Sequence, residues 1–217
     1  MSYFPIYIDL KDKKCVVVGG GRIALRKIEI LHQFGAKIIV IAPYICATIY
    51  KMESNSITLV KRDFYDSDIC DVELVVAATD DKDLNSHISN ICRKRDLLVN
   101  VVDVKEECSF IFPAILKKGE LVISVSTGGS SPAMAHKIRK DIESVIPDYY
   151  SSLIELLGEH RDIIKSEIHS QELRKKIYNE IIEMIEINQE DMSLDTINKV
   201  IDKYKILQEG GCGPDGN

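Results

Sequence analysis

Short apolar runs alternate with amphipathic segments over the first hundred residues. The runs cover 16–18, 37–42, 57–60, 74–78 and 97–102, and between them apolar residues recur every three or four positions. The clearest amphipathic segment carries Ala24, Ile28 and Leu31 and stops at Gly35, a residue type that often follows a helix. This alternation is typical of βαβ units. It predicts an α/β fold with a Rossmann-type sheet of about five parallel strands.

The pattern changes after residue 103. Two strand-like runs, 110–115 and 121–125, are separated by the polar segment 117–120 and predict either a hairpin or a pair of strands outside the parallel order. Ser131 and Pro132 then predict a helix start. Its apolar face carries Met134, Ile138, Ile142 and Val145. From about residue 148 onward only helical stripes remain, which predicts an α-helical C-terminal region. The stripes comprise Leu153, Leu156, Leu157 and Ile164, then Leu173, Ile177 and Ile181, then Leu194, Ile197 and Ile201.

Composition places the chain among globular proteins. Its 217 residues are 45% hydrophobic and 29% charged. The longest apolar runs are far shorter than the roughly 20 residues that cross a bilayer, so no membrane partner is expected. The start of the chain shows no basic region followed by an apolar stretch, so no signal peptide is predicted and a cytoplasmic location is expected.

Charge and cysteines narrow the function classes. The net charge of −6 arises after residue 150, where 14 acidic residues face 8 basic ones. Because no basic stripe is visible, no nucleic-acid partner is expected. The six cysteines never form a CxxC pair, which favours ordinary reduced thiols and no protein metal site. Cys212 lies in a glycine-rich tail and is compatible with a role as a metal or redox ligand. A lone thiol in such a tail, however, more often belongs only to a frayed chain end.

A glycine motif follows the first strand. Gly19-x-Gly21-x-x-Ala24 joins the apolar run 16–18 to a helix, the context in which such a pattern predicts dinucleotide binding. Gly19 would allow the tight turn, Gly21 would let the backbone approach a pyrophosphate, and Ala24 would let helix and strand pack closely. The helix N-terminus would then face the phosphates. The alternative is a glycine-rich turn that binds nothing.

One expected partner of the cofactor is missing. An acidic residue about 20 positions further on normally accepts the ribose hydroxyls. Here the second strand ends in Ala42, Pro43 and Tyr44. The choice between NAD and NADP stays open on this point, but no arginine replaces the acid, which favours NAD.

Polar residues follow the fourth and fifth strands. Thr79 and Asp80 end one, and Asn100 and Asp103 flank the end of the other. Ligands of open α/β sheets bind at this carboxyl edge. A carboxylate directly after a buried strand can act as a general base, which makes Asp103 the candidate. A helix cap or a surface turn is the competing interpretation.

A loop of small residues precedes the helix at 132. It runs Ser126-Thr127-Gly128-Gly129-Ser130-Ser131, and Lys137 follows on the helix. Hydroxyls and glycines at a helix N-terminus form an anion cradle that would suit a polycarboxylate ligand. A capped loop with solvated lysines is an equal alternative.

These segments together resemble the precorrin-2 dehydrogenase and sirohydrochlorin ferrochelatase family, which also forms the amino-terminal part of sirohaem synthase. The likeness covers about 150 residues in the family's order. It is carried by Phe4–Tyr7, Val16–Lys27, Ala77–Asp80, Asn100–Asp103, Ser109–Ala114 and Ser124–Pro132.

The resemblance implies a domain order and a reaction. A Rossmann domain would span 1–112, a dimerisation region 113–147, and a helical region 148–217, in a homodimer. Precorrin-2, a polycarboxylate tetrapyrrole, would lose a hydride to NAD and a proton to a base, which yields sirohydrochlorin. Family members often also insert ferrous ion at the same site, where the macrocycle nitrogens would be the metal ligands.

The resemblance also assigns residues. The catalytic aspartate falls on Asp103. Combined with the motifs above, the expected cofactor-binding residues are Gly19, Gly21, Arg22, Ile23, Ala24, Pro43, Tyr44, Thr79, Asp80, Asn100 and Val101. The expected substrate-binding residues are Ser109, Phe110, Ser126, Thr127, Gly128, Ser130, Ser131 and Lys137.

Two other classes of function compete with the dehydrogenase. A regulatory Rossmann module would bind NAD without chemistry, but such modules usually carry the acidic ribose ligand that is missing here. A chelatase alone would have a vestigial dinucleotide site, against which the intact Gly19, Gly21 and Ala24 argue.

Overall fold

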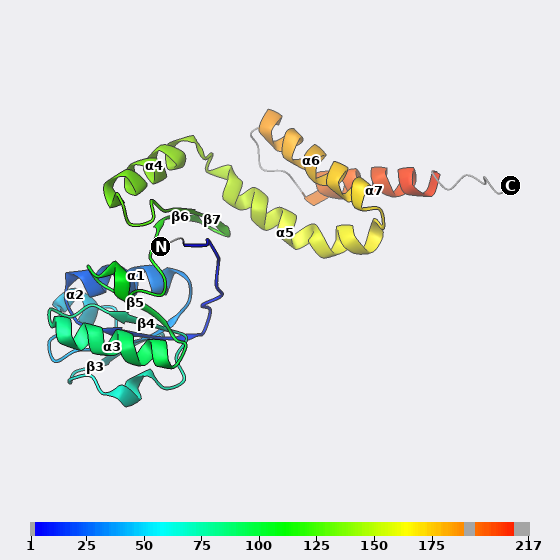
Figure 1. The fold of residues 1–217 in the computed structure, drawn as a ribbon. Helices are drawn as coiled ribbons and strands as arrows, with labels where there is room; N and C mark the ends of the chain where they lie inside the picture. Colours follow the sequence, from blue (N-terminus) through cyan, green and yellow to red (C-terminus); the bar gives the residue numbers. More distant parts are fainter. Residues whose placement is uncertain (1–2, 189–193, 211–217) are drawn as a thin grey trace. The chain divides into compact units, whose positions relative to one another are not determined.

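The structure, a computed structural model, describes residues 3–188 and 194–210. The chain forms two compact units, whose helices and strands are labelled in Figure 1. Unit 1 contains the residues up to Pro113 together with Ser126–Ser131. Unit 2 contains Ala114–Val125 together with the residues from Pro132 onward. The three-part domain division expected from the sequence stays a prediction.

Unit 1 is built on a parallel sheet, as the apolar runs predict. Its strands are β1 (Lys14–Val18), β2 (Lys37–Ile41), β3 (Ile57–Val60), β4 (Leu74–Ala77) and β5 (Leu98–Val101). They lie in the order β3-β2-β1-β4-β5, and every pairing is parallel. The strand order reverses between β1 and β4, so a crevice outside their carboxyl ends is the position at which such sheets bind ligands.

Helices cover both faces of this sheet (Figure 1). On one face, α1 (Arg22–Gln33) and α2 (Ala47–Tyr50) pack against alternate strand residues such as Val17 and Val40. On the other, α3 (Lys82–Lys94) packs against the intervening residues, such as Val16 and Val75. Two short 3₁₀ turns, η1 (Asp66–Ile69) and η2 (Lys105–Glu107), complete the unit. Continuous apolar runs form central strands because both faces of the sheet are covered.

Two cysteines buried in these cores make stability depend on pH. Burial raises the pKa of Cys15 from 9.0 to about 12 and that of Cys92 from 9.0 to about 11. The folded state then keeps protons that the unfolded chain releases, so this stability is fully present below about pH 9 and is lost as pH rises toward 11. We expect the free energy of unfolding to fall by about 1.4 kcal/mol per pH unit for each thiol.

Urea unfolding of the wild type and of Cys15→Ala/Cys92→Ala over a series of alkaline pH values checks this expectation. The double variant should be less stable at neutral pH but lose stability less steeply as pH rises. Equal slopes would show that these thiols do not carry the pH dependence.

Unit 2 begins with the hairpin β6 (Ala114–Lys118) and β7 (Leu121–Val125), which pair antiparallel. The prediction that the first of these strands starts at Phe110 is wrong. Phe110 and Phe112 instead pack on the core of unit 1, and Pro113 interrupts the run because it has no N–H to donate. The helix expected after Ser131 is α4 (Pro132–Val145).

The described residues of unit 2 form three further helices. They are α5 (Tyr149–Glu167), α6 (Gln171–Asn188) and α7 (Leu194–Gly210). The predicted stripes form one core, with Ile164, Ile177, Ile181 and Ile197 fully buried. The side chain of Leu194 and the whole of Cys212 lie outside the described residues.

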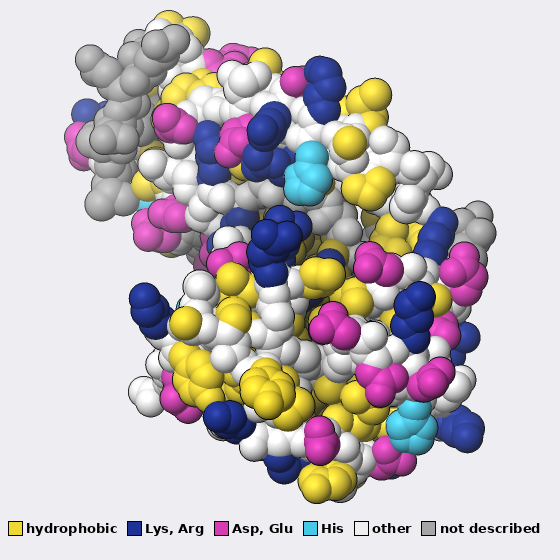
Figure 2. All heavy atoms as spheres, turned by 90° about the vertical axis from the view of Figure 1, so that its left-hand side faces the viewer, with side chains coloured by type: hydrophobic (Ala, Val, Ile, Leu, Met, Phe, Trp, Pro, Cys, Tyr) yellow, Lys and Arg dark blue, Asp and Glu magenta, His cyan; other side chains and the backbone are white. Residues whose placement is uncertain are grey.

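The surface carries charged side chains of both signs, as expected from a chain that is 29% charged. Figure 2 shows basic and acidic side chains interspersed over the face that it draws. In the part of the chain that the structure describes, no helix is long and apolar enough to cross a membrane.

Candidate functional site

The candidate site lies at the carboxyl edge of the unit 1 sheet, in the segments that follow strands β1, β4 and β5. The turn after β1 carries Gly19, Gly20 and Gly21, the segment after β4 begins at Ala78, and the turn after β5 carries Asp103. The loop Ser126–Ser131 belongs to the same unit.

Close contacts with neighbouring backbone require glycine at two of these three positions. Gly19 has a φ of +125°, and a Cβ there would lie 2.2 Å from the carbonyl oxygen of Ala78. A Cβ on Gly20 would lie 2.0 Å from the carbonyl oxygen of Tyr44. The spacing motif does not include Gly20, so sequence reasoning missed it. Only the chain path after β2, whose Cys46 N–H donates to the Gly20 carbonyl at 2.9 Å, reveals the constraint.

Gly21 and Ala24 differ from these glycines. A Cβ on Gly21 would meet nothing within 4 Å, so this side of the turn is open to a ligand. Gly21 is the N-cap of α1 but supplies no side-chain acceptor, and the first turn of α1 has no acidic residue. The first-turn amides therefore remain available to an anion. Ala24 is fully buried against the sheet, the position expected for close helix packing.

The residues around this turn are accessible. Arg22, Ile23 and Pro43 are exposed, and Tyr44 is 86% exposed. An exposed tyrosine next to an open glycine turn can pack on a flat ring such as a nucleobase. The residues present therefore fit a bound dinucleotide.

The segment after β4 is mostly committed to structure. The Thr79 hydroxyl donates to Asn85 Oδ1 at 2.8 Å, and the Asp81 carboxylate caps α3 by accepting from the N–H groups of Asp83 and Leu84. Asp80 is exposed. Ligand contacts of Thr79 and Asp80 stay predictions.

Asp103 occupies a strained turn directly after β5. Its φ is +62°, in the left-handed region that few residues other than glycine adopt and that aspartate and asparagine tolerate best. The side chain is exposed, and no described residue forms a hydrogen bond or an ion pair with its carboxylate. Asp12, Asp71 and Asp96 adopt the same region, so what distinguishes Asp103 is its exposed carboxylate at the carboxyl edge of the sheet.

Cys108 holds the Asp103 turn closed. Its buried sulfur accepts from the Val101 N–H at 3.2 Å and lies 3.2 and 3.3 Å from the carbonyl oxygens of Val101 and Val104. Burial raises the pKa of the Cys108 thiol, so it stays protonated and can donate to these carbonyls. Cys108 was absent from the predicted site, because an isolated cysteine carries no motif signal.

The next contacts fix the chain that leaves the turn. The Asn100 side chain is buried and donates to the Phe110 carbonyl at 3.0 Å, and Ser109 pairs with Val99 through both its backbone and its hydroxyl. The predicted roles of Asn100 and Val101 toward cofactor, and of Ser109 and Phe110 toward substrate, stay predictions.

A half-buried lysine on α1 lies beside this segment. The Lys27 ammonium is 4.0 Å from the centre of the Phe112 ring, and burial lowers its pKa.

The serine-glycine loop 126–131 is preorganised by its own hydroxyls. Ser126 Oγ accepts from the Gly128 N–H at 3.1 Å, and Thr127 Oγ1 accepts from the Ser131 N–H at 3.0 Å. Gly128 and Gly129 have φ values of +62° and +85°, which a turn this tight requires. Because these hydroxyl oxygens act as acceptors within the loop, their protons point elsewhere and can reach a ligand carboxylate.

One lysine joins the loop to the Asp103 turn. Lys105 Nζ donates to the carbonyl of Gly128, and its aliphatic stem lies against Gly129. Lys105 was also absent from the predicted site. Two segments that the sequence placed more than twenty residues apart are therefore in direct contact.

Lys137 lies on α4, in unit 2, where its ammonium pairs with Asp141 at 2.6 Å. Its predicted role toward substrate stays a prediction. Within residues 3–188 and 194–210, no cluster of His, Cys, Asp and Glu could hold a metal ion.

Comparisons with known proteins agree with this geometry. Residues 6–114 match the family described as putative NAD(P)-binding, and residues 118–144 match the central region of sirohaem biosynthesis proteins. The chain is 38% identical over 217 residues to the siroheme synthase of Thioalkalivibrio sulfidiphilus, an alignment that covers 97% of this chain and 44% of that protein. It is 40% identical over 176 residues to the siroheme synthase of Ruthia magnifica, covering 81% and 37%. The chain thus spans less than half the length of these relatives.

A solved structure resembles both the sequence and the fold. The protein described as SirC, precorrin-2 dehydrogenase, matches with a TM-score of 0.78 and 29% identity, over 93% of this chain and 100% of that one. The family resemblance and the Rossmann-type fold inferred from the sequence are confirmed.

Proposed function

Because the chain belongs to the putative NAD(P)-binding family, which matches residues 6–114 of its 217, we propose that it oxidises precorrin-2 to sirohydrochlorin with NAD. One observation carries this proposal. The open glycine turn, the strained Asp103 turn and the hydroxyl loop all belong to unit 1, and Lys105 holds the last two together. The sequence relatives and the solved structure are named for sirohaem synthesis and for this reaction.

The chain's own residues would bind the cofactor at the first turn of α1. The amides of Arg22, Ile23 and Ala24 would donate to the pyrophosphate, with Gly21 giving it room and exposed Tyr44 lying against the adenosine. The bound nicotinamide supplies the acceptor for a hydride.

Asp103 would then accept the proton that leaves precorrin-2 when the hydride is lost. It is free of internal partners, so its carboxylate can turn toward the substrate. The hydroxyls of Ser126 and Thr127 would donate to substrate carboxylates, since their oxygens already accept from the loop. Precorrin-2 plus NAD⁺ thus gives sirohydrochlorin, NADH and one proton.

The test is to incubate the purified chain with precorrin-2 and NAD and to follow NADH absorbance, with NADP in a parallel reaction. We expect NADH to form, and to form faster with NAD. NAD binding without any NADH would instead favour a nucleotide-sensing module.

We also propose that the chain works as a homodimer through α4 and the hairpin. Met134, Ile138 and Val145, spaced to share one side of α4, are 50%, 37% and 73% exposed. The hairpin β6-β7 packs on α4, as a sheet of two strands requires for stability. The apolar side chains that are exposed on α4 suit a second copy of the chain.

Ile138→Asp is expected to shift the protein from dimer to monomer, because it places a charge in the apolar interface. Light scattering after size-exclusion chromatography measures the mass. Lys140→Asp, at an exposed position on the other side of α4, is the matched control and should remain dimeric. A monomeric wild type, or an Ile138→Asp protein that remains dimeric, would rule this interface out.

Insertion of ferrous ion into sirohydrochlorin is a further proposed activity of the same site. The macrocycle nitrogens would ligate the metal, and Asp103 could accept the displaced pyrrole protons. Adding ferrous or cobaltous ion to sirohydrochlorin with the protein, and following the absorbance of the macrocycle, tests chelation separately. If metal insertion is no faster with the protein than without it, the chain has no chelatase activity and the dehydrogenase proposal stands by itself.

We propose a cytoplasmic location for this chemistry. The described cysteines 15, 46, 70, 92 and 108 are all free thiols, and disulfides are rare in that compartment. Cell fractionation with an antibody against the chain tests it.

A further inference from the structure

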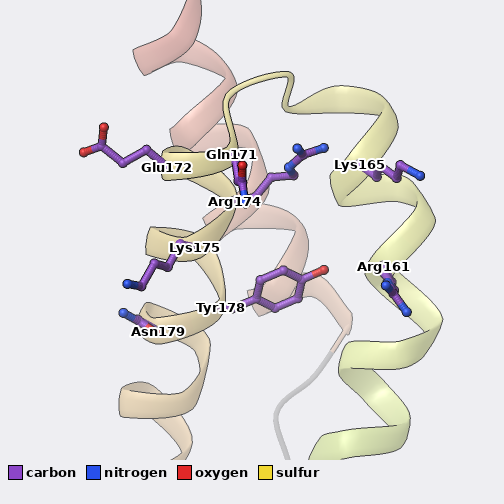
Figure 3. A pocket seen from close by; sticks show the side chains of 8 residues that line it. All are labelled: Arg161, Lys165, Gln171, Glu172, Arg174, Lys175, Tyr178 and Asn179. Carbon is purple, nitrogen blue, oxygen red and sulfur yellow. The ribbon is translucent and has the colours of Figure 1, made fainter.

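A cleft of about 830 Å³ opens between α5 and α6 in unit 2 (Figure 3). This volume falls within the range of about 300–1,000 Å³ that is typical of small-molecule sites. Figure 3 shows Arg174 and Tyr178 extending from α6 toward α5. The lining residues are Arg161, Lys165, Gln171, Glu172, Arg174, Lys175, Tyr178 and Asn179.

Basic residues line the cleft, although the region after residue 150 is acidic overall. Eight basic residues follow residue 150, against 14 acidic ones. Four of the eight form ion pairs with acidic side chains, namely Lys176, Lys199, Lys203 and Lys205. The other four line the cleft: Arg161, Lys165, Arg174 and Lys175.

None of these four cations forms an ion pair with any residue that the structure describes. The one acidic lining residue, Glu172, is paired with Lys176 at 3.0 Å. The lining of the cleft therefore carries an excess of unpaired positive charge.

This arrangement costs helix stability unless an anion is present. Arg161 and Lys165 are four residues apart on α5, and like charges at that spacing repel each other. Elsewhere in the unit the same spacing holds opposite charges, as in Lys176–Glu172 and Lys199–Asp195. A bound anion would relieve the repulsion in the cleft.

The walls of the cleft are held by the core. Ile164 lies between the two α5 cations in sequence, Ile177 lies next to Tyr178, and both isoleucines are fully buried. The turn from α5 to α6 is tied to α7, because Gln208 accepts from the His169 N–H at 2.8 Å. The four cations thus project from fixed helices rather than from a loose segment.

We propose that this cleft binds a small polyanion that carries two or more carboxylate or phosphate groups. The Arg161 and Arg174 guanidinium groups match such oxyanions through paired N–H donors, and Lys165 and Lys175 add charge. Gln171, Tyr178 and Asn179 add neutral hydrogen-bond donors. This site is separate from the residues of the proposed dehydrogenase reaction and does not depend on them.

The test is an NMR titration of the full-length chain with citrate and, separately, with inorganic pyrophosphate. Backbone amides of residues 161–179 report the cleft, and those of residues 19–24 report the glycine turn, so binding at one is not mistaken for binding at the other. We expect saturable shifts at 161–179 with at least one of the two anions, and weaker binding as salt is raised. Shifts with only one anion would identify whether carboxylates or phosphates are preferred.

Arg161→Gln/Arg174→Gln should weaken that binding by about tenfold or more, because it removes a charged donor from each wall. Lys199→Gln/Lys203→Gln removes the same charge from the same unit, at residues whose ion-pair partners do not line the cleft, and should change the binding by about twofold or less. No shifts at 161–179 with either anion up to millimolar concentrations would overturn the proposal. Equal losses in the two double variants would overturn it as well, since they would mean net charge alone acts.

Discussion

Asp103→Asn is expected to lower the turnover of precorrin-2 by about 10²–10⁴-fold, the usual contribution of a positioned general base. The amide cannot accept the proton. The NAD dissociation constant should stay within about twofold, because the glycine turn proposed to bind the cofactor is untouched. Stopped-flow NADH absorbance and a separate NAD titration measure the two quantities.

Asparagine is the matched substitution because of the backbone. At a φ of +62° an alanine would add strain of about 1–2 kcal/mol, whereas asparagine tolerates this region as well as aspartate does. A loss of activity in Asp103→Asn with an unchanged urea midpoint therefore reports on chemistry rather than on folding. Full activity in this variant would remove Asp103 from the mechanism.

Gly20→Ala is expected to destabilise unit 1 by about 3 kcal/mol or more and to abolish NAD binding. The added Cβ would lie 2.0 Å from the Tyr44 carbonyl oxygen, which belongs to backbone and cannot swing aside. The turn after β1 and the segment after β2 must then separate, which opens the cofactor edge of the sheet. Urea unfolding and NAD titration measure both effects.

Gly21→Ala is the matched control for that substitution. Its φ of −91° suits alanine, and its Cβ would meet nothing within 4 Å. We expect a stability loss of about 1 kcal/mol or less, from the poorer N-cap, together with clearly weaker NAD binding. If Gly21→Ala binds NAD as tightly as the wild type does, the turn is not the phosphate site.

The sheet was predictable because burial on both faces leaves a direct trace in the sequence. Runs such as 16–18 and 74–78 are apolar at every position, and each became a central strand. The start of β6 was not predictable in this way. Phe110 and Phe112 are as apolar as a strand requires, but they bury themselves on the core of unit 1 rather than pairing. Hydrophobicity indicates that a residue is buried, and not which partner buries it.

The sequence could predict the candidate site only where a residue type stands in a motif context. Glycines that join a strand to a helix, and an aspartate directly after a buried strand, are such contexts. Gly20, Lys105 and Cys108 were missed because their importance comes from contacts across the fold, with Tyr44, Gly128 and Val101. No spacing rule within the chain encodes those contacts.

The assignment of Ser126–Ser131 to unit 1 means that the backbone passes between the two units three times, after Pro113, Val125 and Ser131. A protease cut in any one of these crossings would leave at least one fragment that carries residues of both units. A gene fragment that stops at Pro113 would encode the proposed nucleotide site without the hydroxyl loop, so we expect it to bind NAD yet lack part of the proposed substrate site. The segments proposed to bind cofactor and substrate could therefore not be exchanged between proteins by a single genetic junction.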